Sequence, residues 1–289
     1  MSAEPRDPTV ALVASRIRED ELRLMAALER RRIRFVQVDS RKLVTVLGDP
    51  APPWRVALNR EIGSTRAMYA AEALETAGVR VINSAAAVAV CRDKWRTSVA
   101  LHQAGLPTPR TALAQTPEAA LEALATVGYP AVIKPLVGSW GRMVAPVPDP
   151  QVAATVLEYV GALPSPQSHV VYVQELVEKP DRDIRVIVID GRVIGAVYRR
   201  ATGWRTNVAT GAVTEPCPVT DDLAKAAVRA ADAVRAEIAG VDLLERADGS
   251  LVVLEVNQGV EFSGFHRALG DRVDVADEIV SHLVARTGP

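Results

Sequence analysis

The stretch between Gly240 and Asn257 constrains the fold of this chain more than any other segment. Asp248-Gly249 in its middle is a strong hairpin signal, because a two-residue type I′ turn needs φ > 0 at both central positions. Counting outward from that turn places Asp242 opposite Glu255, with Cβ atoms roughly 5 Å apart. Asn257 shares the face of Glu255, because side chains alternate along a strand. The segment is therefore predicted to be a β-hairpin with two carboxylates and an amide on one face.

These three side chains suggest a divalent-metal site. Directly opposed carboxylates destabilise a strand pair unless a positive charge neutralises them. Mg²⁺ prefers oxygen ligands and usually takes one or two carboxylates together with substrate phosphates. An ordinary amphipathic hairpin with a polar outer face has the same pattern, so the hairpin alone leaves both interpretations open. The same count also pairs Leu244 with Val253 and Ala247 with Ser250.

Composition restricts the classes of protein to which the chain can belong. A length of 289 residues allows two or three small domains, and 48% hydrophobic with 24% charged residues is ordinary for a globular protein. The net charge of −1 provides no general attraction to nucleic acid or to a membrane surface. The sequence has no apolar run of transmembrane length and no signal peptide, and Cys91 and Cys217 lack the spacing of a metal site. We expect a cytoplasmic protein without nucleic-acid or membrane partners.

The pattern of hydrophobic residues divides the chain into three parts, 1–90, 91–168 and 169–289. Strands and helices alternate in the first part, as in a small parallel α/β unit. A helix over 84–104 ends at a Gly-Leu-Pro-Thr-Pro boundary, after which strands and two further helices follow. The last part favours an antiparallel sheet, then a helix over 220–239, the hairpin and a final helix over 273–286. The predicted fold class is α/β (α+β).

Two of the five lysines stand where phosphate contact is expected. The strand over 131–134 ends in Lys134 and leads into a loop with Gly138 and Gly141, and glycines let backbone N–H groups approach a phosphate. Lysine supplies a compact point charge in a chain whose other basic residues are arginines. Lys94 follows Asp93 in a helical region, where a solvent-facing lysine is the alternative interpretation. The spacing around Lys134 also fits a structural loop.

Charged and polar side chains gather on the strands after residue 180. Asp183 and Arg185 share one face of a strand, and Arg199, Arg205 and Asn207 lie on or beyond the next strand. Arginine binds phosphate and carboxylate in a bidentate manner, so this group suggests a site for anions. Solvated arginines in an arginine-rich protein are the alternative for each residue taken singly.

The register of that second hairpin decides which arginine faces the site. Counting from Asp190-Gly191 without irregularity puts Arg200 on the face of Arg185. A β-bulge would put Arg199 there instead, so the sequence leaves the choice open.

Taken in chain order, these elements resemble the ATP-grasp superfamily and, within it, the RimK-like amino-acid ligases. The similarity covers almost the whole chain and is carried by Cys91–Ser98, Ala104–Pro109, Val132–Arg142, Gln174–Pro180, Arg182–Arg185, Tyr198–Arg200, Arg205–Asn207, Gly240–Leu243 and Glu255–Phe262. Gly-Ser-Trp-Gly-Arg at 138–142 and Glu-Phe at 261–262 are typical of the branch that attaches an amino acid to an amino-group carrier protein in lysine and arginine biosynthesis. The resemblance implies an ATP-grasp fold with an N-terminal Rossmann-like (preATP-grasp) domain.

The resemblance also implies a role for each candidate residue. The residues that would contact the phosphates of ATP or fold over them are Lys94, Lys134, Gly138, Ser139, Trp140, Gly141 and Arg142. Those that would bind adenine and ribose are Gln174, Glu175, Val177 and Asp183. Those that would face the phosphates, the acyl-phosphate or the substrate carboxylates are Arg185, Arg199, Arg205 and Asn207. Mg²⁺, with Mn²⁺ as an alternative, would be held by Asp242, Glu255 and Asn257.

The implied reaction is ATP-dependent amide formation by an acid–amino-acid ligase that releases ADP and phosphate. The C-terminal glutamate side chain of a small acidic carrier protein would be phosphorylated to an acyl-phosphate, from which the α-amine of glutamate or α-aminoadipate would displace phosphate. Gly264-Phe265 resembles the glutamate-using members and favours glutamate. Val208–Ala212 departs from the Arg-Gly-Gly of relatives. We also expect a homo-oligomer, a dimer or a tetramer, and an excess of basic residues over 16–42 suggests a docking face for the carrier.

Three alternatives stay open at this point. A ligase of this superfamily can act on free amino acids or peptides, as glutathione synthetase and D-alanine–D-alanine ligase do. A second alternative adds glutamate to the C-terminus of a ribosomal protein. The third is an ATP-binding regulatory protein without turnover, against which the intact set of lysines and metal ligands argues.

Overall fold

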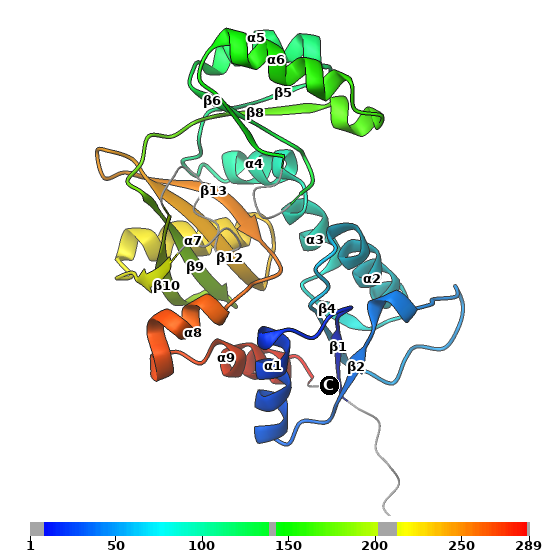
Figure 1. Cartoon of the computed structure of the whole chain (residues 1–289). Helices are drawn as coiled ribbons and strands as arrows, with labels where there is room; N and C mark the ends of the chain where they lie inside the picture. Colours follow the sequence, from blue (N-terminus) through cyan, green and yellow to red (C-terminus); the bar gives the residue numbers. More distant parts are fainter. Residues whose placement is uncertain (1–8, 139–142, 202–212, 288–289) are drawn as a thin grey trace, which may run out of the picture.

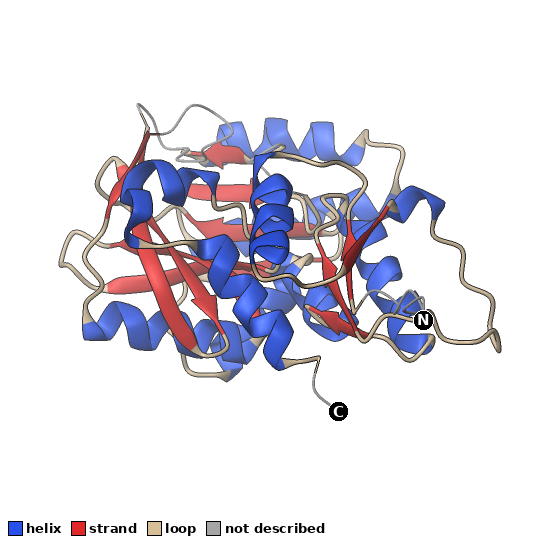
Figure 2. Ribbon diagram, turned by 90° about the horizontal axis from the view of Figure 1, so that it is seen from below, coloured by secondary structure: helices blue, strands red, loops and turns tan. Residues whose placement is uncertain are grey.

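The computed structural model describes residues 9–138, 143–201 and 213–287. The described chain forms three sheets with helices around them, which confirms the predicted α/β (α+β) class (Figure 1). Figure 2 shows the helices flanking the strands when the molecule is seen from below. In the described residues no helix is long and apolar enough to cross a membrane.

The first sheet is parallel and has the strand order β2-β1-β3-β4. Its elements are β1 (Val10–Val13), α1 (Glu19–Arg30), β2 (Phe35–Val38), the 3₁₀ helix η1 (Ser40–Lys42), β3 (Val56–Asn59), α2 (Ser64–Thr76) and β4 (Arg80–Ile82). Leu24 and Leu28 of α1 cover one face of β1, while Ala70 and Leu74 of α2 cover the other. Both faces are therefore apolar, which explains why β1 and β3 are hydrophobic runs without alternation.

The second sheet is antiparallel and has the order β5-β8-β6-β7. Its elements are β5 (Thr111–Ala114), α5 (Pro117–Val127), β6 (Ala131–Lys134), β7 (Ala145–Val147), α6 (Pro150–Gly161), the 3₁₀ helix η2 (Pro166–His169) and β8 (Val171–Glu175). The helix predicted over 84–104 is two helices, α3 (Ala85–Cys91) and α4 (Lys94–Gln103). The break occurs because the Asp93 side chain caps α4, accepting hydrogen bonds from the N–H groups of Trp95 and Arg96.

The third sheet is antiparallel and has the order β11-β10-β9-β12-β13. Its elements are β9 (Arg182–Ile189), β10 (Arg192–Arg200), β11 (Val213–Pro216), α7 (Asp221–Ala233), β12 (Ile238–Glu245), β13 (Leu251–Asn257), α8 (Ser263–Leu269), the 3₁₀ helix η4 (Gly270–Arg272) and α9 (Val275–Ala285). The helix predicted over 220–239 ends earlier, because Arg235 has a positive φ and Ile238 already begins β12. The hydrophobic pattern of the sequence does not predict β7, β11 or α8.

The turn of the β12–β13 hairpin differs from the predicted two-residue type I′ turn. Arg246 donates its N–H to the Ser250 carbonyl at 2.8 Å, and Gly249 donates to the Arg246 carbonyl at 2.9 Å. Within the turn only Gly249 has a positive φ, of +82°. This is a three-residue loop, in which a type I turn is followed by a glycine in the left-handed region.

The longer loop changes the register near the turn. Leu244 pairs with Val252, so the predicted pairing with Val253 was wrong. An irregularity next to Asp242 then shifts the register by one residue, and Asp242 lies opposite Glu255 as predicted. The two deviations cancel at the carboxylates. The predicted juxtaposition of Asp242 and Glu255 is therefore confirmed, although the predicted turn type and the predicted register near the turn were wrong.

The N-terminal unit packs against the C-terminal end of the chain. Figure 1 places α9 beside α1, and residues of both helices share one hydrophobic cluster. Arg31, which directly follows α1, pairs with Asp277 of α9 at 2.6 Å. The buried Asn83 side chain bonds to the backbone of Ile238 and to the carbonyl of Gln258. The strand that ends in Asn257 is therefore fixed against the N-terminal unit.

Candidate active site

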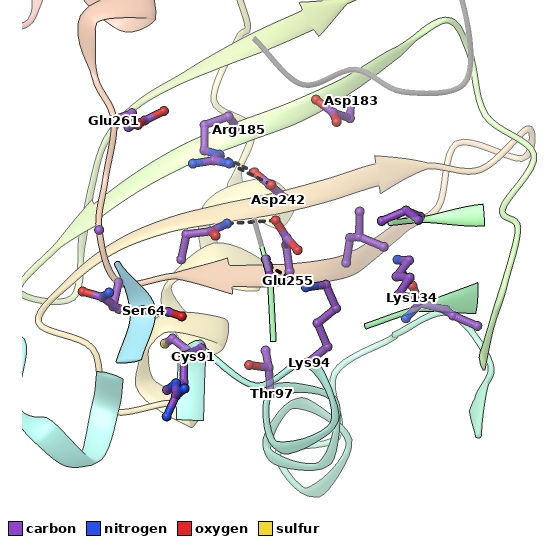
Figure 3. Close-up of a pocket in the computed structure, with 18 of the residues that line it drawn as sticks. Ser64, Cys91, Lys94, Thr97, Lys134, Asp183, Arg185, Asp242, Glu255 and Glu261 are labelled. Carbon is purple, nitrogen blue, oxygen red and sulfur yellow. Dashed lines mark hydrogen bonds and ion pairs between the residues drawn. The ribbon is translucent and has the colours of Figure 1, made fainter. Parts of the chain in front are cut away.

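A cavity of about 290 Å³ is lined by residues of the second and third sheets, of helices α2, α3 and α4, and of loops of the N-terminal unit. Figure 3 shows Lys134 and Asp183 toward one side of this cavity, Ser64 and Cys91 toward the other, and Asp242, Glu255 and Lys94 between them. The cavity therefore has two ends that are joined by a charged middle.

Every predicted site residue that the structure describes lines this cavity. They are Lys94, Lys134, Gly138, Gln174, Glu175, Val177, Asp183, Arg185, Arg199, Asp242, Glu255 and Asn257. The remaining predicted residues, Ser139, Trp140, Gly141, Arg142, Arg205 and Asn207, lie outside the described residues.

The first end has an apolar wall. Val177 follows strand β8 and packs with Leu244 of β12 and Leu254 of β13. Val132 of β6 also lines the cavity here. A flat apolar group such as a purine ring fits between such walls.

Two lysines lie beside this apolar region. The Lys134 ammonium group donates to the Gln174 side-chain oxygen at 2.5 Å, and that amide in turn donates to the Tyr172 hydroxyl at 2.7 Å. The Lys94 ammonium group donates to the Gly138 carbonyl at 2.8 Å, at the start of the glycine-containing loop. Burial lowers the pKa of Lys134 to about 8. Both cations are thus held by neutral oxygens, without a carboxylate salt bridge among the described residues.

The carboxylates occupy the middle of the cavity. Burial alone would raise the pKa of Glu255, but the nearby Lys94, a hydrogen bond from Asn257 and the charge of Lys134 lower it to about 2. The Asn257 amide donates to Glu255 at 3.1 Å, which leaves its own oxygen for another partner. Burial raises the pKa of Asp242, whereas the Arg185 and Arg199 charges oppose that shift.

Asp242 is held by two arginines. Arg185 contacts both of its oxygens in a bidentate ion pair, with the second contact at 2.8 Å, and Arg199 lies 3.1 Å away. A Cβ atom on Gly240 would come within 2.8 Å of the Arg185 guanidinium, so the glycine makes room for this pair. A carboxylate has about four lone-pair sites, so a cation can share Asp242 with them. Two ionised carboxylates and an amide oxygen suit a hard divalent cation.

Arg199, rather than Arg200, belongs to the cavity. Arg199 is 5% exposed and donates to both oxygens of Asp183, at 2.6 and 2.8 Å. Arg200 is exposed and pairs with Glu215. A bulge in β10 between Val193 and Gly195 causes this outcome, because it shifts the register that the simple count had assumed.

The N-terminal unit and the segment after β13 form the second end of the cavity. Arg18, Arg60, Ser64, Arg92 and Glu261 line it. Arg18 donates to Glu261 at 2.6 Å, and Arg60 is buried. These residues were not predicted as site residues. Arg18, Arg60 and Ser64 lie far in sequence from the motifs, whereas Arg92 and Glu261 lie inside two of the motifs but were given no role there. The apolar wall residues Leu244 and Leu254 were missed because they look like core residues.

Gly264 and Phe265 do not line the cavity. These are the two residues whose resemblance to glutamate-using members favoured glutamate as the incoming amino acid. Phe265 is 3% exposed and belongs to the core cluster shared with α9. The Gly264 carbonyl accepts a hydrogen bond from Thr214, and a Cβ atom on Gly264 would lie 3.2 Å from the methyl group of that residue. Any influence of this pair on the substrate must therefore be indirect, through the position of β11.

Comparisons with known proteins show which families of domains the chain resembles. Residues 91–283 match the RimK-like ATP-grasp domain, and residues 10–90 match the LysX preATP-grasp domain. The glutamate–LysW ligase ArgX of Sulfolobus acidocaldarius is 33% identical over 95% of this chain and 97% of its own length. The α-aminoadipate–LysW ligase LysX of Saccharolobus solfataricus is 35% identical over 71% of this chain and 75% of its own length.

A solved structure gives the same result for the fold. The crystal structure of a RimK domain ATP-grasp protein from Sphaerobacter thermophilus superposes with a TM-score of 0.80, at 28% identity, and the match covers 94% of this chain and 98% of the other. The family resemblance inferred from the motifs is thereby confirmed: this chain belongs to the RimK-like ATP-grasp family of ATP-dependent ligases.

Proposed function

We propose that the enzyme joins the C-terminal glutamate side-chain carboxylate of a small acidic carrier protein to the α-amine of glutamate or α-aminoadipate, at the cost of ATP. The observation that carries this proposal is the cavity with two ends. One end has the apolar wall and the lysines that suit a nucleotide, the middle has ionised oxygen ligands, and the second end is polar and lies beside the N-terminal unit. The names of the two relatives, a glutamate–LysW ligase and an α-aminoadipate–LysW ligase, support the choice of substrates.

The first end would receive ATP. Adenine would lie against Val177, Leu244 and Leu254, and the phosphates would extend toward Lys134 and Lys94. The lysines suit this role, because their present acceptors are neutral oxygens that a phosphate can replace. Asp183 already accepts two hydrogen bonds from Arg199, so a ribose hydroxyl would have to share that carboxylate.

Asp242, Glu255 and Asn257 would hold Mg²⁺, with Mn²⁺ as an alternative. The low pKa of Glu255 supports this assignment, because it keeps an ionised oxygen ligand in a buried place. When bound, the ion would neutralise charge on the transferred phosphoryl group. Arg185 and Arg199 both lie against the Asp242 carboxylate and would add positive charge around the reacting oxygens.

The reaction would proceed in two displacements. A carboxylate oxygen of the carrier attacks the γ-phosphorus, the bond to the bridging oxygen breaks, and ADP leaves. The α-amine of the incoming amino acid then attacks the acyl carbon, the amine loses a proton, and inorganic phosphate leaves with the carbon–oxygen bonding pair. The cavity walls would protect the acyl-phosphate from water between the two steps.

Part of the basic surface over 16–42 remains available for an acidic carrier. Five of its basic side chains already have acidic partners within the chain: Arg18, Arg23, Arg30, Arg31 and Arg41. The other basic residues are exposed and have no salt bridge among the described residues: Arg16, Arg32, Arg34 and Lys42. We therefore limit the docking hypothesis to these four.

The test combines Mg²⁺-ATP, a purified acidic carrier and either glutamate or α-aminoadipate, and reads the intact mass of the carrier together with ADP release. A mass gain of one amino acid minus water supports the proposal and names the substrate. Lys134→Met should abolish the gain, whereas Lys225→Met makes the same chemical change at an exposed position on α7, away from the cavity. ADP release with free amino acids or peptides and no carrier would instead support the free-substrate alternative.

A further inference from the structure

Five arginines line the cavity among the described residues, and one of them differs from the others. Arg18, Arg60, Arg185 and Arg199 each form an ion pair with a carboxylate. Arg92 lines the same cavity and has no carboxylate within ion-pair distance anywhere in the described parts of the chain. Among the described residues it is thus the one cavity arginine whose charge no carboxylate compensates.

The donors of Arg92 have weak or neutral partners. Its guanidinium donates to the Thr65 hydroxyl at 2.8 Å and to the Met68 sulfur at 3.2 Å, and a thioether is a weak acceptor. Its Nε–H is buried and has no partner among the described residues. Arginine has five N–H donors, and each terminal nitrogen keeps one beyond these contacts, so the guanidinium can also bind an anion that arrives from outside the chain.

The start of helix α2 contributes a hydroxyl group at this position. Ser64 begins the helix and lines the cavity. The preceding Gly63 has no side chain to cap the helix, but its N–H donates to the Glu61 carboxylate at 2.7 Å, and Glu61 lines the same cavity. That carboxylate offsets the partial positive charge of the helix start. Arg92 and Ser64 together therefore present a guanidinium and a hydroxyl group to one end of the cavity.

The distance from the nucleotide end suggests which anion binds there. Figure 3 places Cys91, the neighbour of Arg92, and Ser64 on the side of the cavity away from Lys134. In the proposed reaction the α-amine must reach the acyl-phosphate in the middle of the cavity, so the adjacent α-carboxylate also stays near the middle. The side-chain carboxylate of an acidic amino acid lies farther out along its methylene chain.

We propose that Arg92, together with Ser64 at the start of α2, binds the side-chain carboxylate of the incoming amino acid and so selects an acidic substrate. This inference rests on the proposed function and adds to it the residue that makes the enzyme prefer glutamate or α-aminoadipate over their neutral amides. Arginine suits the task, because its planar fork binds a carboxylate in a bidentate manner.

The test measures kcat and KM with glutamate and with glutamine, for the wild type, Arg92→Gln, Arg92→Lys and Arg96→Gln. Arg96 is the matched control, because it is four residues further along the chain, its side chain is 64% exposed, and it does not line the cavity. Arg92→Gln should lower kcat/KM for glutamate on the order of 10- to 100-fold through KM, while kcat/KM for glutamine and KM for ATP stay nearly unchanged. Arg92→Lys should restore part of the preference for glutamate, and Arg96→Gln should behave like the wild type.

The outcomes separate this inference from the proposed function. Equal losses with glutamate and glutamine in Arg92→Gln, or an unchanged KM for glutamate, would overturn it. Should Arg92→Gln fold poorly in a thermal melt, the preference of Arg92→Lys for glutamate over glutamine tests the inference instead. That variant keeps the positive charge but lacks the planar, bidentate guanidinium. Should the wild type modify no carrier, ADP release with free acidic amino acids and their amides replaces the mass readout. A preference for the acids that disappears in Arg92→Gln then supports the inference although the carrier proposal fails, and no preference rejects it.

Discussion

Arg60 ties three parts of the molecule together, and its replacement by methionine should be strongly destabilising. The residue follows β3, and its side chain is 4% exposed. It donates to Glu21 of α1 at 2.9 Å and to the Val260 carbonyl at 2.6 Å, and it lies 3.6 Å from Asp20. Arg60→Met removes the cation and leaves two buried carboxylates behind.

The size of the destabilisation depends on the partners that each carboxylate retains after Arg60 is replaced. Removing one partner of a buried ion pair usually costs about 3–5 kcal/mol. Glu21 retains Arg18 at 3.0 Å, which brings the expected loss toward the lower limit. Asp20 retains only the Phe262 N–H among its described hydrogen-bond donors, and burial raises its pKa. We therefore expect Arg60→Met to lose about 3 kcal/mol of unfolding free energy, and Asp20→Asn in the same background to recover part of it.

Urea denaturation followed by circular dichroism and by calorimetry measures both effects. Arg66→Met is the control, since Arg66 pairs with Glu61 but its side chain is 48% exposed, and it should lose less than about 1 kcal/mol. A loss below about 1 kcal/mol for Arg60→Met would refute the assigned role. A further loss on adding Asp20→Asn would refute the explanation by an uncompensated carboxylate.

Three other expectations concern charge. Nucleotide affinity should weaken about tenfold between pH 7 and pH 9, because the protonated fraction of Lys134 falls as pH rises through its pKa of about 8. Titration calorimetry measures this affinity, and in Lys134→Met the affinity should no longer depend on pH in this range. Hydrogen bonds from His282 and Arg286 lower the pKa of Glu237 to about 2, so its stabilisation is present above its ordinary value of 4.5 and is lost as pH falls toward 2. Glu237→Gln should remove that part of an acid-denaturation curve. Arg31→Glu should cost less than about 1 kcal/mol in urea, because both side chains of its pair with Asp277 are 36% exposed.

The sequence was sufficient to predict those elements whose hydrophobic pattern extends over many consecutive residues. The parallel N-terminal unit was predicted from its alternating strands and helices, and the structure has a four-stranded parallel sheet with helices there. The three-residue strand β7 and the seven-residue helix α8 were missed, since segments of that length have too few positions to establish a period. The break between α3 and α4 depends on one capping side chain, Asp93, inside an otherwise helical pattern.

The sequence predicted residues that the fold brings together, but not the geometry that joins them. All described candidates line one cavity, but the choice between Arg199 and Arg200 depended on a bulge near Gly195. A Cβ atom on Gly195 would lie 3.2 Å from Leu269, a residue of α8 far away in the chain. The position of the bulge therefore reflects a tertiary contact, which strand counting does not include.

The same limit applies to the charges of the cavity. Residue types alone make Arg92 and Arg199 equivalent, since both are arginines beside a recognised motif. In the folded chain Arg199 is neutralised by Asp183 and Asp242, whereas among the described residues Arg92 donates to a hydroxyl group and a sulfur atom and to no carboxylate. A cation that the fold has already paired holds the site in shape, and one that the fold leaves unpaired is available to a ligand. The pairing in three dimensions thus distinguishes the residue that organises the site from the residue that selects the substrate.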